Sequence, residues 1–410
     1  MSITTLRAAV LAGALLPAFA GAAPLTLPQA LERAVQRSAS ARAARADVSS
    51  AAESARAAGQ LPDPTLQAGV DNLPVQGSER FNARDDSMTM KRIGIGLEWV
   101  SHDKRAARQA AADAMVSRQS VSAGAAAADT RLQTALAYLD AWYAGETLAL
   151  ATLGEHHAHE EFEAARARLA SSTGNAQEAL AATSARGIAE DESADARQAR
   201  AEAATALQRW VGTPADDLAA PVLPPAPAEA AYVDADPAVA AARSGVELAR
   251  RDADATAAER HANWSWQASY GQRSGYPDMV SVGVSIPLQI APAERQDRQT
   301  AAKLALIEKA EALLDDATRA ATAQYRSLAG DAARLAERIA RYRSAVIEPA
   351  HQRTEAALAG YRSNQLSLAA LFEARHMEVE AQRKSLALQR DLARAQAQLA
   401  YRPLAEGDRP

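Results

Sequence analysis

The residues of this sequence best suited to bind a metal ion lie together in the segment EHHAHEE. Three histidines, His156, His157 and His159, alternate there with alanine and glutamate. Imidazole nitrogens and carboxylate oxygens are suitable ligands for zinc, cobalt or nickel. In a helix, residues four positions apart share a face, so His157 would lie beside Glu161. A solvated helix face is the commoner reason for such a cluster, so two interpretations stay open: transient metal binding by the three histidines, or ordinary surface charge.

The rest of the sequence offers no arrangement of residues for catalysis. It contains no cysteine, which excludes disulfides, thiolate metal sites and cysteine nucleophiles. It has no nucleophile elbow and no phosphate-binding glycine loop. The net charge is -5 and acidic and basic residues are interspersed, which gives no basic surface for nucleic acid. We therefore expect no enzymatic activity, no cofactor and no nucleic-acid partner.

The N-terminus has the pattern of a secretory signal peptide. Arg7 provides a positive charge, residues 8–20 are mostly apolar, and small residues follow. We predict a signal peptide over residues 1–22, cleaved after Ala20 or Ala22. No later stretch approaches the ~20 apolar residues of a membrane-spanning helix. The sequence thus predicts an exported protein that could enter a membrane only through strands.

Two predicted hairpins carry strands with one apolar face. Apolar residues alternate with small or polar ones over residues 92–100 and again over 279–288. Such hairpins could pack on helices in a soluble protein, but four strands are too few to close a barrel, so a lipid-facing role would require an oligomer. We predict that the apolar faces contact lipid through Ile93, Ile95, Leu97, Trp99, Trp264, Trp266, Val280, Val282, Val284 and Ile286.

The order of elements occurs twice along the chain. In each half, a helix precedes a hairpin, and a pair of long helices with coiled-coil spacing follows it. Ile93 corresponds to Val282 and Asn175 to Asn364, at a constant separation of 189 positions (282 − 93). This duplication predicts one structural unit used twice. The first repeat is predicted over 23–212, with an opening helix over 27–58, a hairpin over 65–100 and helices over 103–169 and 176–210. A Pro-rich linker over 213–235 leads to the second repeat over 236–401, with a hairpin over 264–288 and helices over 294–360 and 366–400. A disordered tail is predicted over 402–410.

The long helix after each hairpin would extend about 100 Å at 1.5 Å per residue, and Pro349 is expected to bend the second one locally. Each long helix ends in a polar turn, so the hairpins should lie at one end of a rod and the turns at the other. Asn175 and Asn364 stand in these turns, with Glu178 and Glu373 shortly after them. In an oligomer these carboxylates would form rings that select cations, although ordinary surface charge is the alternative.

This organisation resembles the TolC-like family of outer-membrane efflux channels. The resemblance covers nearly the whole mature chain and rests on the duplicated plan, on VSVGVSIPL at the end of the second hairpin, on the helix phrase DPAVAAARSGVELA, and on the turn YRSNQLSLAALFEAR. VSVGVSIPL followed by a charged helix start is most similar to the heavy-metal branch, of cobalt-zinc-cadmium or copper-silver type. Many members begin with an acylated cysteine, which this chain does not have.

The resemblance implies a mainly α fold with transmembrane β structure, in which a trimeric α-helical barrel is capped by a shared barrel of twelve strands. It implies a homotrimer in the bacterial outer membrane that extends into the periplasm and docks on a periplasmic adaptor of a tripartite, RND-type pump. The channel would passively conduct heavy-metal cations outward, with Glu178, Glu373, Asn175 and Asn364 at its periplasmic aperture. The alternatives are a soluble periplasmic coiled-coil scaffold or adaptor, and a drug-exporting channel of the same family.

Overall fold

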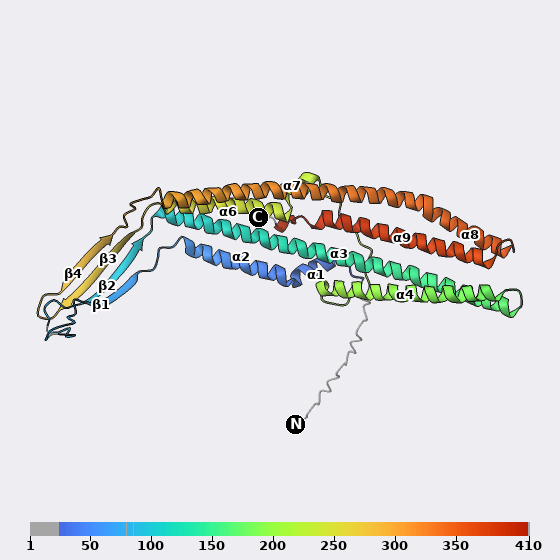
Figure 1. Ribbon diagram of the computed structural model, residues 1–410, viewed down its shortest axis with the longest axis horizontal. Coiled ribbons are helices and arrows are strands. Elements are labelled where there is room, and N and C mark those ends of the chain that lie inside the picture. The colour runs from blue at the N-terminus through green and yellow to red at the C-terminus, as the bar shows by residue number, and fades with distance from the viewer. Residues whose placement is uncertain (1–23, 79, 85, 409–410) are drawn as a thin grey trace, which may run out of the picture.

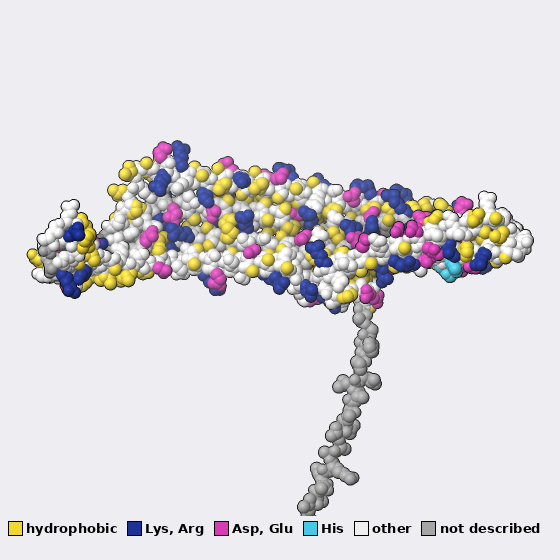
Figure 2. All heavy atoms as spheres, turned by 60° about the horizontal axis from the view of Figure 1, so that its bottom comes forward, with side chains coloured by type: hydrophobic (Ala, Val, Ile, Leu, Met, Phe, Trp, Pro, Cys, Tyr) yellow, Lys and Arg dark blue, Asp and Glu magenta, His cyan; other side chains and the backbone are white. Residues whose placement is uncertain are grey.

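The computed structural model is an elongated rod of helices with a β-sheet at one end (Figure 1). It describes residues 24–78, 80–84 and 86–408, so the predicted signal peptide over 1–22 lies outside the described residues. The turns that join the long helices lie at the end opposite the sheet, which we call the tip. Charged side chains of both signs are spread along the rod (Figure 2), as expected for helices that expose one face to water.

The predicted opening helix is divided in two at Ser38. The first part, α1, covers Leu27–Arg37, and the second, α2, covers Ala39–Ala58. Ser38 leaves the helical conformation with φ -55° and ψ 119°, and its hydroxyl accepts a hydrogen bond from the backbone N–H of Ala41. A serine that caps a helix satisfies one of the unpaired N–H groups of the first turn, so the break stabilises the start of α2.

Polar side chains cap the starts of α3 (His102–Ala170), α4 (Ala176–Val211) and α9 (Leu368–Tyr401). The Ser101 hydroxyl accepts from the Lys104 N–H, the Asn175 side chain from the Glu178 N–H, and the Ser367 hydroxyl from the Ala370 N–H. The remaining helices are α5 (Glu229–Asp234), α6 (Pro237–Ala258), α7 (Gln296–Tyr342) and α8 (Glu348–Arg362). The short α5 lies inside the segment expected to be a linker.

A π-helical turn over Arg343–Ile347 separates α7 from α8, within the segment predicted as one helix over 294–360. Pro349 follows this turn directly after Glu348. Proline has no N–H to donate, and its ring clashes with the carbonyl of the residue four positions earlier. The wider π turn accommodates both effects, and this is the local disturbance expected at Pro349.

The main hydrophobic core lies where α1, α3, α4 and α9 meet in the middle of the rod. Tyr138 of α3 is fully buried there, and its hydroxyl lies 2.6 Å from the carbonyl oxygen of Leu25 and 2.7 Å from that of Ala219. A buried hydroxyl needs such acceptors to offset the loss of water. Tyr138 thereby ties the start of the described chain and the segment after α4 to the same point of the rod.

The prediction of a disordered tail over 402–410 is wrong for residues 402–408. Leu404 is 3% exposed and packs against Val121 and Ala240, and its N–H donates to the carbonyl of Ala235 at 2.8 Å. The carboxylate of Asp408 pairs with Arg131. A short charged segment has no periodicity from which its packing could be predicted. Its one leucine, Leu404, packs against helices that are distant in the sequence.

Candidate membrane-facing sheet and helical tip

The two hairpins form one antiparallel sheet in the order β1-β2-β3-β4. The strands are β1 (Thr65–Asp71), β2 (Met90–Trp99), β3 (Trp264–Arg273) and β4 (Met279–Ser285). The pairing of β2 with β3 joins the hairpins of the two repeats, so β1 and β4 are the edge strands. The sheet projects from the end of the helical rod, and both of its faces are therefore open (Figure 1).

One face of the sheet is apolar across all four strands. Directly opposed residues of antiparallel strands share a face, and the central row of this face is Leu66, Ile95, Ala268 and Val282. Val282 is 73% exposed and Ile95 58%. The neighbouring rows contain Ala68, Ile93, Tyr270 and Val280 on one side, and Leu97, Trp266 and Val284, then Trp99 and Trp264, on the other. We call these residues the apolar face.

The opposite face carries small and polar residues. Gly94 lies there between Gln67 and Ser269. A Cβ atom on Gly94 would come within 2.7 Å of the Cβ of Ser269, so this position requires glycine. Arg92 and Asp71 pair on the same face at 3.4 Å. The sheet is therefore apolar on one side and polar on the other.

Ile286 lies outside the strand in which it was predicted. The expected strand extended to Leu288, but β4 ends at Ser285, whose partner on β3 is Ser265. Pro287 follows two positions later and has no N–H for a ladder hydrogen bond. Ile286 is exposed beyond the end of the ladder. Separately, no helix among the described residues is long and apolar enough to cross a membrane.

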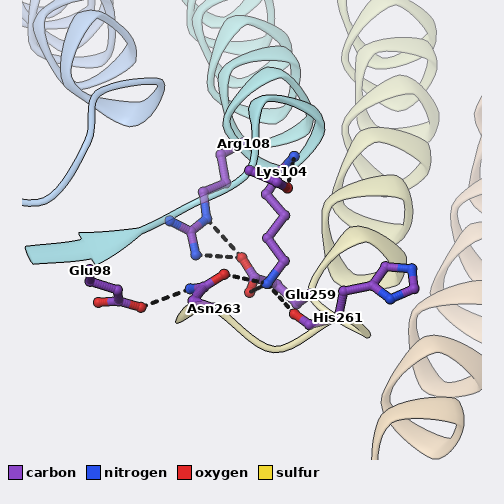
Figure 3. A network of polar contacts seen from close by, with 7 residues as sticks. Glu98, Lys104, Arg108, Glu259, His261 and Asn263 are labelled. Atoms are coloured by element: carbon purple, nitrogen blue, oxygen red, sulfur yellow. Dashed lines mark hydrogen bonds and ion pairs between the residues drawn. The ribbon is translucent and has the colours of Figure 1, made fainter. Parts of the chain in front are cut away.

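A buried lysine holds the sheet against the helices (Figure 3). Lys104 in the first turn of α3 is 3% exposed, and its ammonium donates to the side chain of Asn263 at 2.5 Å, to Glu259 at 3.4 Å and to the carbonyl of His261. Arg108 donates to the same glutamate at 2.8 Å. Asn263 in turn donates to Glu98 of β2 at 2.8 Å.

This junction cluster links the start of α3 in the first repeat to the end of α6 in the second. Three acceptors compensate the buried ammonium, which would otherwise be costly to remove from water. No local pattern in the sequence indicates this cluster. Lys104 and Glu259 are 155 positions apart in the sequence, and a single lysine at a helix start carries no pattern that distinguishes a buried side chain from a solvated one.

The predicted aperture residues lie at the tip. Asn175 caps α4 by accepting from the N–H of Glu178 at 2.8 Å, and Glu178 is half-buried in the first turn. Asn364 adopts φ 56° in the corresponding turn of the second repeat, a left-handed conformation that asparagine tolerates. Glu373 is exposed and accepts from Arg353 at 3.0 Å. Arg353 therefore balances the charge of Glu373.

The three predicted metal ligands do not converge. The exposed His156 pairs with Glu160 at 3.4 Å, and His159 is also exposed. His157 instead lies half-buried, and its Nδ1 atom is buried without a hydrogen-bond partner. In the part of the chain that the structure describes, no three histidine, aspartate or glutamate side chains are placed to hold a metal ion. The structure thus gives no support to a metal site of His156, His157 and His159.

Instead, His157 lines a cavity of about 350 Å³ between α3, α4 and α9. Glu161, one turn later on α3, lines the same cavity and is 7% exposed. Burial raises the pKa of Glu161 to about 7, although the neighbouring Arg375 acts in the opposite direction. Burial also lowers the pKa of His157, and Arg375 adds to that effect. Both side chains thus favour their neutral forms in this cavity.

No protein-family model matches the sequence, and no curated protein sequence matches it either. The fold is similar to the open state of the MtrE outer membrane channel of Neisseria gonorrhoeae, with a TM-score of 0.77 and 18% identity over 92% of this chain and 88% of that chain. It is similar to the CmeC outer membrane channel of Campylobacter jejuni, with a TM-score of 0.74 and 12% identity over 92% and 85%. It is also similar to the outer membrane protein VceC of Vibrio cholerae, with a TM-score of 0.69 and 18% identity over 90% and 96%.

These similarities cover 90% or 92% of this chain. Because the sequence identities are low, these similarities show the fold and not the substrate. This chain has the fold of bacterial outer-membrane channels.

Proposed function

We propose that this chain is the outer-membrane subunit of a channel made of three copies, whose sheets join into one barrel of twelve strands. The observation that carries this proposal is the apolar face, which spans all four strands while β1 and β4 each keep one unpaired edge. In lipid, each unpaired backbone group costs several kcal/mol, so an open sheet must close. Four strands per copy reach the size range of known barrels only in an oligomer.

The helical rod would form a tunnel continuous with the barrel. α3 contains 69 residues and extends about 100 Å at 1.5 Å per residue. With the barrel in the outer membrane, the rod would extend into the periplasm and present the tip there. The proposed location agrees with that of the similar structures, which are outer-membrane channels.

We infer that the tip docks on a periplasmic adaptor, which connects the channel to an inner-membrane pump of RND type. The channel would conduct its substrate passively toward the outside. For the substrate we propose heavy-metal cations, on the basis of the resemblance carried by VSVGVSIPL and of the acidic residue Glu178 near the tip. Asn175 and Asn364 would lie at the aperture, and Glu373 would contribute less charge because it pairs with Arg353.

The rival function is a soluble periplasmic scaffold, and the apolar face argues against it. Side chains such as Val282 and Ile95 are more than half exposed within one continuous patch. Patches of this kind on soluble proteins mark an interaction surface or a membrane contact. A scaffold would therefore need a partner sheet at this end, whereas a barrel needs only further copies of the same chain.

Fractionation of cells and a conductance measurement test the proposed function. We expect the full-length chain in the outer-membrane fraction, as an oligomer that dissociates on heating in detergent, and we expect ion conductance in planar bilayers. A monomer in the soluble periplasmic fraction would support the scaffold instead. The substrate is tested separately: deletion should lower tolerance to zinc, cobalt or copper salts, while lowered tolerance to organic drugs alone would favour a drug-exporting channel.

A further inference from the structure

The cavity near the tip differs from an ordinary gap between helices in the chemistry of its walls. It measures about 350 Å³, within the range of small-molecule sites. Its apolar walls include Ile188 of α4 and Phe372 and Val379 of α9. Its polar wall on α3 consists of His157 and Glu161. An apolar body and a charged group could therefore be held in it together.

Most carboxylates that line this cavity already have a cationic partner. Glu192 accepts from Arg383 at 2.8 Å, and Glu380 accepts from the same arginine at 2.9 Å. Glu373 accepts from Arg353 at 3.0 Å. The pair of Glu380 with Arg383 lies within α9, whereas the other two pairs join neighbouring helices. All three carboxylates thus have a cationic partner.

Glu161 differs from them because no cationic side chain donates a hydrogen bond to it, although Arg375 lines the same cavity and lies near it. Glu161 is 7% exposed, and its carboxylate accepts no hydrogen bond from a described residue. The nearby Arg375 is committed to Glu160, at 3.3 Å. On the same wall, the Nδ1 atom of His157 is buried without a partner. A buried polar atom without a partner, such as Nδ1 of His157, needs a compensating group, which an ordered water or a ligand can supply.

We propose that this cavity binds an organic cation, whose ammonium group is held by Glu161 and His157 and whose apolar body lies against Phe372 and Val379. An ammonium donates up to three hydrogen bonds, which suits a carboxylate oxygen and an unprotonated imidazole nitrogen on adjacent turns of one helix. Phe372 offers an aromatic ring to the same cation. The site is separate from the apolar face and does not depend on the proposed transport function.

An organic cation fits these walls better than a metal ion does. The described residues contain no group of three ligands placed for a metal, and the apolar walls cannot hydrate an ion. A hydrated divalent cation would leave Ile188, Phe372 and Val379 facing water, whereas a ligand with an apolar body covers them.

Binding of 2-phenylethylammonium to the purified full-length chain in detergent tests the proposal by isothermal titration calorimetry. The titrations are made at pH 8, above the pKa of about 7 of Glu161, so that its carboxyl group is ionised. The matched variants are Glu161→Gln, which removes this buried carboxylate, and Glu163→Gln, which removes an exposed charge two positions along the same helix. We expect Glu161→Gln to weaken binding at least about tenfold, a ratio that corresponds to about 1.4 kcal/mol, and Glu163→Gln to leave it unchanged. The uncharged 2-phenylethanol should bind at least about tenfold more weakly than the ammonium.

Thermal denaturation of each variant shows whether it folds, and His157→Gln provides a second variant if Glu161→Gln does not. The proposal is overturned if the wild-type chain does not bind the ammonium, or if Glu161→Gln binds it as well as Glu163→Gln does. It is also overturned if 2-phenylethanol binds equally well, or if zinc binds in a manner that depends on His157 while the ammonium does not bind.

Discussion

An arginine placed on the apolar face should prevent insertion, while an arginine at the adjacent position should not. Val282 lies in the middle of β4, in the central row of the apolar face, and is 73% exposed. Ser281 is its neighbour in the chain and lies on the polar face opposite Ser269. Val282→Arg and Ser281→Arg therefore add the same side chain to the same strand, on opposite sides of the sheet.

The expected difference follows from depth in the bilayer. An arginine on the lipid face of a barrel costs about 2–4 kcal/mol at the midplane and about 0–1 kcal/mol near the interfaces. Val282 lies in the central row, with two apolar rows on one side and one on the other. In the proposed barrel it would therefore lie near the midplane, and we use the midplane value. Three copies would raise the cost for the assembly to about 6–12 kcal/mol. In the proposed barrel, the arginine of Ser281→Arg would face the polar interior, where no such cost applies.

The assay is the amount of heat-dissociable oligomer in the outer-membrane fraction at equal expression. We expect wild-type amounts for Ser281→Arg and a loss of at least about tenfold for Val282→Arg, because about 1.4 kcal/mol already corresponds to a factor of ten. Equal amounts of the two variants, whether both high or both low, would show that the two faces of the sheet do not differ in contacting lipid and water. The proposed barrel would then be wrong.

Four further predictions concern the rod and the tip. Lys104→Met should lower the free energy of unfolding by about 2–3 kcal/mol, because three hydrogen bonds of a buried charge are lost while Glu259 keeps its ion pair with Arg108. An unchanged denaturation curve would mean that the junction cluster does not stabilise the fold. Leu404→Ala should cost about 2–4 kcal/mol in the same measurement, since the side chain is buried, and an unaffected variant would restore the expectation of a loose tail. The pKa of Glu161 is raised from 4.5 in the unfolded chain to about 7 in the folded state, so the folded state binds more protons between these values. The contribution of Glu161 to stability is therefore full below about pH 4.5 and is lost as the pH rises through 7, a fall of about 3 kcal/mol. Denaturation at pH 5 and pH 8 should show this fall in the wild type and not in Glu161→Gln. Glu178→Gln should reduce cation selectivity in planar bilayers more than Glu373→Gln does, because Arg353 already balances the charge of Glu373. A larger effect of Glu373→Gln would contradict the role given to Glu178.

Local patterns of the sequence were sufficient to predict the elements. The alternation in 279–288 and 92–100 depends only on the two-residue period of a strand, and β4 and β2 lie at these positions. The polar turn after residue 170 was visible because Asn175 is a strong helix cap. The errors at Ser38 and Ile286 arose where one residue decides between two local conformations, and neighbouring residues gave no periodicity to decide it.

For the candidate sites, too, local features could be predicted from the sequence and contacts between distant segments could not. Which residues share the apolar face follows from alternation within each strand, so Ile93, Val282 and their neighbours could be assigned from the sequence. Which strands lie side by side was not readable, because the pairing of β2 with β3 joins segments from different repeats. For the histidines, closeness in sequence was misleading. His156, His157 and His159 lie within four positions but have different surroundings, because successive residues of a helix are turned by about 100°.

The sequence by itself determined the duplicated plan, the length of the rod and the apolar face, since each depends on periodicity or on short-range order. Only the tertiary structure decided that Lys104 is buried at the junction, that Leu404 anchors the tail, and that Glu161 rather than His156 or His159 faces a cavity. The physical reason is that burial of a charged or isolated side chain depends on which distant elements pack over it. That information is distributed over contacts between the two repeats and is absent from any single segment.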